Sequence, residues 1–213
     1  MKVLVTAFDP FGGESVNPAL QAVEQLPDMI EGHTIDKLEV PTVFHQCMVV
    51  VREKLKETAY DVVIAVGQAG GRYEITPERI AINIDDARIP DNQGQQPIDQ
   101  PIQQAGAPAY FTSLPVKRMV EAIRAKGIPA RLSNSAGTFV CNHMMYQLAF
   151  EAATHYPHMR TGFIHVPFAP AQVVNKPEKP SMAIDMMVTG LLTAIKVCLD
   201  YDTDIAAVQG ETH

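Results

Sequence analysis

The chain has 213 residues, of which 46% are hydrophobic and 19% are charged, and this balance excludes a disordered or fibrous protein. The 24 acidic residues outnumber the 17 basic ones, and the net charge of −7 argues against nucleic acid or an anionic membrane as the main partner. No apolar run approaches the roughly 18 residues of a spanning helix, and the first residues do not read as a secretory signal, so we expect a cytoplasmic protein.

The length favours a single domain over residues 1–213. Three cysteines, Cys47, Cys141 and Cys198, form an odd and sparse set without a CxxC pair. Such a set suits neither a disulfide framework nor a structural zinc site, and it fits a reducing compartment. We expect no metal, and we expect no cofactor either.

The first half of the chain alternates strand-like and helix-like runs. Residues 2–7 predict a buried first strand, and Asn17-Pro18 predicts a helix with an N-cap and a proline at its first position. Apolar side chains at helical spacing predict a helix over about 42–58, and the apolar run 61–66 predicts a strand. Residues 85–114, rich in Gln and Pro, break the pattern and are expected to line a site or contact another subunit.

The second half continues the alternation. Pro115 opens a predicted helix that Gly127 ends, and strands are predicted at 130–133 and 162–166. Further helices are predicted from near Cys141 to about His155 and over about 181–199. This order predicts an α/β fold, a three-layer α/β/α sandwich whose twisted, mixed sheet is mostly parallel.

Cys141 is the first candidate for chemistry. It follows a predicted strand and a turn of small residues, where a helix begins. Free backbone N–H groups and the positive end of the helix dipole favour a thiolate there, and the same N–H groups suit a developing oxyanion. A small buried side chain is the alternative, and Cys47 and Cys198, on apolar helix faces, fit that alternative.

A catalytic cysteine needs a base and a group that orients it. His165 lies near the end of the strand 162–166, at the edge where open α/β sheets bind ligands. Spacing leaves the orienting carboxylate open among four residues of one region. These are Glu78, Asp85, Asp86 and Asp91. Glu78 is also free to form a structural ion pair with Arg79 or Arg88.

Four segments carry a resemblance that extends over essentially the whole chain: TAFDPFGGESVNP, GQAGGRYEITPERIAIN, LSNSAGTFVCN and GFIHVPF. Together they resemble the pyrrolidone carboxyl peptidase, or pyroglutamyl peptidase, family of thiol exopeptidases. The resemblance implies that Cys141 is the nucleophile, that His165 is the general base and acid, and that Glu78 orients His165. It also implies a phosphorylase- or hydrolase-like fold and a homotetramer.

The implied reaction removes an N-terminal pyroglutamyl residue from a peptide through a thioester, with Arg88 assisting at the oxyanion. The resemblance also implies a substrate pocket. Its residues would be Phe8, Phe11, Gln68, Ile89, Phe139 and Val140. From periodicity alone, Phe8 and Phe139 fit core packing. A pocket that pairs with the lactam should reject proline, which lacks the ring carbonyl.

Two other functions stay open on the residues alone. One is a phosphorylase-like enzyme, although the glycine loops at 11–13 and 67–71 hold no Lys or Arg and only Arg72 and Arg79 lie nearby. The other is an acidic α/β binding module with a structural cysteine. Activity without phosphate and alkylation of Cys141 below the ordinary thiol pKa would separate these functions from a cysteine peptidase.

Overall fold

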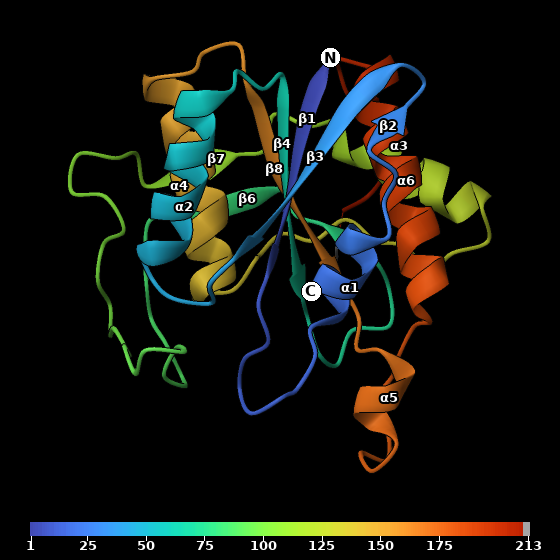
Figure 1. The fold of residues 1–213 in the computed structure, drawn as a ribbon, viewed down its shortest axis with the longest axis horizontal. Coiled ribbons are helices and arrows are strands. Elements are labelled where there is room, and N and C mark those ends of the chain that lie inside the picture. The colour runs from blue at the N-terminus through green and yellow to red at the C-terminus, as the bar shows by residue number, and fades with distance from the viewer. Residues whose placement is uncertain (211–213) are drawn as a thin grey trace.

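The computed structural model describes residues 1–210, and its centre is a mixed, mostly parallel sheet (Figure 1). In spatial order its strands are β2 (Met29–Ile30), β3 (His33–Val40), β1 (Lys2–Phe8), β4 (Val62–Gln68), β8 (Arg160–Val166) and β5 (Thr76–Pro77). The strands from β3 to β8 are parallel to one another, whereas β2 and β5 pair antiparallel at the two edges.

Helices cover both faces of this sheet, which confirms the predicted fold class (Figure 1). One face carries α1 (Pro18–Glu24), α3 (Val116–Ala125) and α6 (Ile184–Asp200), and the other carries α2 (Gln46–Glu57) and α4 (Val140–Thr154). The short helix α5 (Pro170–Val173) follows β8, and β6 (Ile80–Ile82) pairs with β7 (Ala109–Phe111) beside α4.

The apolar strands explain why two cores form. Along β1, Val3, Val5 and Ala7 face the core beneath α1, α3 and α6, whereas Leu4 and Phe8 face the core beneath α2 and α4. Successive side chains of a strand point to opposite faces, so a continuously apolar strand must be covered on both sides.

Local signals explain several of the helix starts. The Asn17 side chain accepts a hydrogen bond from the N–H of Ala19 at 3.0 Å, with Pro18 at the first helical position, as predicted. The helix expected from residue 42 begins only at Gln46. His45 has φ +61°, and the N–H groups of Thr42 and Phe44 donate to the carboxylates of Asp9 and Asp91, so this segment is held as a turn.

The strands differ from the predicted ones in two places. Residues 130–133 form an extended segment with isolated bridges at Ala130 and Ser133, without a full strand. The strand β3 was not predicted, because its sequence HTIDKLEV is mostly polar and only half-buried. Residues 85–114 hold β7 and a bridge between Asp85 and Gln100, so part of the segment is paired.

The strand directions place the functional end of the molecule. The carboxyl ends of β1, β4 and β8 lie together, since these parallel strands are neighbours in register. Open α/β sheets bind ligands outside such ends. Within the described residues, no helix combines the length and the apolar character needed to cross a membrane.

Candidate active site

His165 and Glu78 form a buried pair at the end of β8. Nδ1 of His165 lies 2.7 Å from Oε1 of Glu78, and Glu78 is fully buried. The backbone holds Glu78 there, because its N–H donates to the carbonyl of Phe163 on β8 at 2.9 Å. The contact at Nδ1 leaves Nε2 as the free nitrogen of the imidazole.

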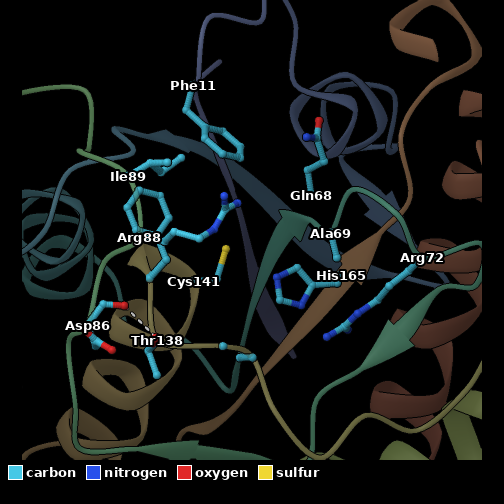
Figure 2. Close-up of a pocket in the computed structure, with 13 residues that line it drawn as sticks. Phe11, Gln68, Ala69, Arg72, Asp86, Arg88, Ile89, Thr138, Cys141 and His165 are labelled. Atoms are coloured by element: carbon cyan, nitrogen blue, oxygen red, sulfur yellow. Dashed lines mark hydrogen bonds between the residues drawn. The ribbon is translucent and has the colours of Figure 1, made fainter. Parts of the chain in front are cut away.

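Cys141 is the second residue of α4, and its thiol lies beside this pair. A Cβ added to Gly67 would stand 3.0 Å from Sγ of Cys141 and 2.8 Å from the ring of Phe163. In the sheet, Gly67 is the direct neighbour of His165. The missing side chain at Gly67 therefore makes room for the sulfur next to the imidazole, and Figure 2 shows both facing one cavity.

The surroundings shift the pKa values of Cys141 and Glu78 in opposite directions. Burial raises the pKa of the Cys141 thiol to about 12; the Glu78 carboxylate adds to this rise, and the Arg72 guanidinium opposes it. Burial also acts to raise the pKa of Glu78, but the hydrogen bond and charge of His165 and the charge of Arg72 outweigh it and lower that pKa. The helix start expected to favour a thiolate is present, but burial opposes it.

Arg72 forms an ion pair with Glu78, a contact that the sequence did not predict. Its Nη1 donates to Oε1 of Glu78 and to Oγ1 of Thr76, each at 2.7 Å, and its Nη2 donates to the carbonyl of Ser135 at 3.1 Å. In the described contacts, the ion pair of Glu78 is therefore with Arg72 and not with Arg79 or Arg88. Spacing offered no reason to choose among these arginines.

A cavity of about 320 Å³ opens in front of the thiol (Figure 2). Among the residues expected in a substrate pocket, Phe11, Gln68, Ile89 and Phe139 line it, as does Arg88. Phe8 and Val140 do not line it, since both are buried in the core beneath α2 and α4. Other lining residues are Ala69, Arg72, Asp86, Ala136, Gly137 and Thr138.

Hydrogen bonds tie the first turn of α4 and the turn before it to the segment 82–86, which leads to Arg88. The Asn142 side chain bonds the N–H of Ile82 and the carbonyls of Ile82 and Ile84. Oγ1 of Thr138 donates to the carbonyl of Asp86 at 2.7 Å. These contacts fix the thiol relative to the segment that carries Arg88.

The three aspartates considered beside Glu78 have other partners. Asp85 lies 2.8 Å from Nδ1 of His143, forming a second buried carboxylate–imidazole pair whose Nε2 accepts the N–H of His45. Asp91 accepts hydrogen bonds from backbone N–H groups, and Asp86 lies on the cavity wall. In the described contacts, none of them pairs with His165. Within residues 1–210, no group of three or more His, Cys, Asp or Glu side chains is placed to hold a metal ion.

Comparison with known proteins gives a consistent result. The family model for pyroglutamyl peptidase matches residues 1–201. A pyrrolidone-carboxylate peptidase of Staphylococcus carnosus is 62% identical over 211 residues, which is 99% of both chains, and that of Staphylococcus haemolyticus is 62% identical over the full length of both. The crystal structure of pyroglutamyl peptidase I from Bacillus amyloliquefaciens matches with a TM-score of 0.94 at 49% identity, covering 97% of this chain and 98% of that one.

Proposed function

The chain belongs to the pyroglutamyl peptidase family and is a cysteine peptidase that removes N-terminal pyroglutamyl residues from peptides, and we propose that Cys141, His165 and Glu78 are the residues that carry out this hydrolysis. The observation that carries the assignment is the shared cavity. It is lined by the Cys141 thiol and by His165, whose other nitrogen contacts a buried carboxylate at 2.7 Å.

Acylation begins with proton transfer. With a pKa near 12, the thiol holds its proton at neutral pH, so a base must remove it as the sulfur attacks. Nε2 of His165 accepts the proton while Sγ of Cys141 forms a bond to the substrate carbonyl carbon. The carboxylate of Glu78 holds the ring through Nδ1–H and stabilises the imidazolium, which is the role of the third group in such triads.

The tetrahedral intermediate places negative charge on the former carbonyl oxygen. The first N–H groups of α4 have no acceptor within the helix, and they are the donors that we assign to this oxygen. Arg88 lines the same cavity and is the second group that we assign to it. Collapse breaks the C–N bond, and His165 gives its proton to the leaving amine.

The second half of the reaction hydrolyses the thioester. Water enters after the peptide has left, His165 takes a proton from it, and its oxygen bonds to the acyl carbon. Free pyroglutamate then leaves, and the proton returns from His165 to the sulfur of Cys141. Each step uses groups of this chain and water, and no cofactor enters the scheme.

The pocket that we assign to the pyroglutamyl ring is the half of the cavity between Phe11, Phe139, Ile89 and Gln68. Its walls are largely apolar, and Gln68 supplies a directed polar group. A pyroglutamyl ring carries no charged amine, so a pocket without a carboxylate suits it. The buried residues Phe8 and Val140 act behind this wall as packing partners.

We further propose that the chain forms one domain, works in the cytoplasm and assembles as a homotetramer. Both cores pack on one sheet, which supports a single domain. The cysteines are free, which suits a reducing compartment. Size-exclusion chromatography with light scattering tests the assembly, and a monomeric mass at working concentration would contradict a tetramer.

The test of the catalytic assignment is hydrolysis of a pyroglutamyl-aminocoumarin substrate in phosphate-free buffer with thiol and EDTA. We expect turnover by the native protein, none above background by Cys141→Ala, and turnover by Cys198→Ala, a matched control whose thiol is buried in the other core. A folded native protein without activity, or a Cys141→Ala variant that keeps it, would overturn the assignment.

A further inference from the structure

Gln172, on the short helix α5, has an amide whose orientation is fixed by the backbone. Its Oε1 accepts the N–H of Ala169 at 3.0 Å, and its Nε2 donates to the carbonyl of Val16 at 3.5 Å. A backbone N–H can only donate and a carbonyl can only accept, so the oxygen and nitrogen of this side chain are assigned without ambiguity. The residue is buried, which keeps water from competing for these contacts.

The fixed amide sets the orientation of Gln68 in turn. Nε2 of Gln172 lies 2.9 Å from the side-chain amide of Gln68 and can only donate, so the atom it meets is Oε1 of Gln68. The nitrogen of Gln68 is then turned the other way. Figure 2 shows this nitrogen on the side of Phe11, inside the cavity, and the oxygen pointing away from it.

Gln68 therefore offers N–H donors to whatever occupies the cavity. In the described part of the chain, Nε2 of Gln68 has no hydrogen-bond partner of its own. A free donor at this place in the cavity selects a ligand that brings an acceptor to it.

We infer that Gln172 is a positioning residue for substrate selection: it holds Gln68 as a hydrogen-bond donor, and this donor pairs with the ring carbonyl of the pyroglutamyl group. The inference rests on the proposed function of the cavity. It also accounts for the rejection of prolyl peptides. A prolyl N-terminus has no ring carbonyl and carries an ammonium group, which can only donate, so the Gln68 donor would face no acceptor.

The most direct test reverses the direction of the hydrogen bond between Gln172 and Gln68. In Gln172→Glu, a carboxylate still accepts from Ala169 but cannot donate to Gln68. The Gln68 amide is then expected to turn over, with its nitrogen toward the new carboxylate and its oxygen toward the cavity. The ring carbonyl of pyroglutamate would meet an acceptor instead of a donor.

A matched control exists elsewhere in the chain. Nε2 of Gln103 donates to Oε1 of Gln147 at 2.9 Å, which is the same amide-to-amide contact at a site that does not line the cavity. Gln103→Glu therefore makes the same chemical change and the same charge change away from the substrate. A third variant, Gln172→Leu, removes the amide without introducing a charge. The side chain of Gln68 then loses the hydrogen bond that orients it.

The measurement is kcat and KM for matched pyroglutamyl and prolyl aminocoumarin substrates, after circular dichroism has shown which variants fold. For Gln172→Glu we expect about a 10- to 100-fold lower pyroglutamyl kcat/KM, mostly through KM, and a smaller preference over the prolyl substrate. Gln172→Leu should lose less, and Gln103→Glu should keep the native values. If Gln172→Glu does not fold, the preference of Gln172→Leu for the pyroglutamyl over the prolyl substrate tests the inference, and a native preference would overturn it.

A second readout does not depend on turnover. The free lactam 2-pyrrolidone should protect Cys141 from iodoacetamide in the native protein and in Gln103→Glu, and should protect it less in Gln172→Glu. If folded Gln172 variants kept the native preference for the pyroglutamyl substrate and the native protection of Cys141 by 2-pyrrolidone, the inference would be overturned. The proposed function would remain intact. A native protein that hydrolyses no pyroglutamyl substrate would instead overturn the proposed function itself.

Discussion

Cys141, the nucleophile that we propose, lies in surroundings that oppose its ionisation. Burial raises the pKa of its thiol, whereas His165 and Arg72 hold the neighbouring Glu78 as a carboxylate. The thiol therefore holds its proton at rest, and negative charge develops on the sulfur only as the substrate carbonyl is attacked. Removal of the thiol proton therefore depends on His165 as the base and on the Glu78 carboxylate that orients and stabilises its imidazolium.

At the scale of single residues, Glu78→Gln should reduce kcat by about 10²- to 10⁴-fold with little change in KM, because an amide cannot stabilise the imidazolium as a carboxylate does. Steady-state kinetics with the pyroglutamyl substrate measures this effect. The matched control is Asp85→Asn, which alters the other buried carboxylate–imidazole pair, with His143. Asp85→Asn should lose stability with a much smaller change in kcat. Equal losses of kcat in the two variants would contradict the role of Glu78.

The sequence predicted some of these residues for physical reasons and missed others. Cys141 and His165 could be found because a helix start and a strand end are visible in local patterns. Glu78 could not be separated from Asp85 and its neighbours by spacing, and only the family resemblance selected it. The Gln172 contact to Gln68 joins residues 104 positions apart, and no local pattern encodes such a contact.

At the scale of elements, Asp91 anchors the loop that carries Arg88 and Ile89. Its two carboxylate oxygens accept the N–H groups of Phe44, Gln93 and Gln95 at 2.8 to 2.9 Å. The loop is thereby tied to the turn before α2. One buried side chain thus holds part of the cavity wall in place.

Asp91→Asn should weaken this anchor, because an amide nitrogen would face a backbone donor and cost about 1–3 kcal/mol. We expect a several-fold higher KM and faster proteolytic cleavage within residues 92–96. Asp61→Asn is the control, since Asp61 accepts the N–H of Lys2 at the opposite end of the sheet. A KM for Asp91→Asn that matches that of Asp61→Asn would contradict the anchoring role.

The predicted elements differ from the observed ones where contacts between residues far apart in the sequence determine the secondary structure. Apolar strands such as β1, β4 and β8 are visible in the sequence because burial on both faces demands apolar residues throughout. The strand β3 is mostly polar, and its pairing with β1 decides its structure. The late start of α2 depends on the carboxylates of Asp9 and Asp91, which periodicity cannot register.

At the scale of the whole molecule, two cores on one sheet bury the two thiols that lie outside the candidate site, those of Cys47 and Cys198. Burial raises the pKa of both Cys47 and Cys198, that of Cys198 to about 12. The folded protein keeps these thiols protonated, whereas the unfolded chain releases their protons near the ordinary thiol pKa of about 8.5. Their contribution to stability is therefore fully present below that pH and is lost as the pH rises toward 12.

The free energy of unfolding should consequently fall between about pH 9 and pH 11, which urea denaturation at a series of pH values measures. In Cys198→Ala the decline should be shallower by about 1.4 kcal/mol per pH unit, because one titrating thiol has been removed. This variant also loses stability at every pH, because the smaller side chain leaves a cavity. The test is therefore the slope of the free energy of unfolding against pH, and not its absolute value. An unchanged slope would show that the thiol does not control alkaline stability.

We propose that the pyroglutamyl group passes through a thioester on Cys141. The most direct measurement is acid quench during turnover of a pyroglutamyl ester, whose good leaving group favours accumulation of the acyl-enzyme, followed by mass spectrometry of the digested protein. We predict one pyroglutamyl group on the peptide that contains Cys141, and none on Cys47 or Cys198. Turnover without acylation of Cys141, or acylation at another residue, would contradict the account.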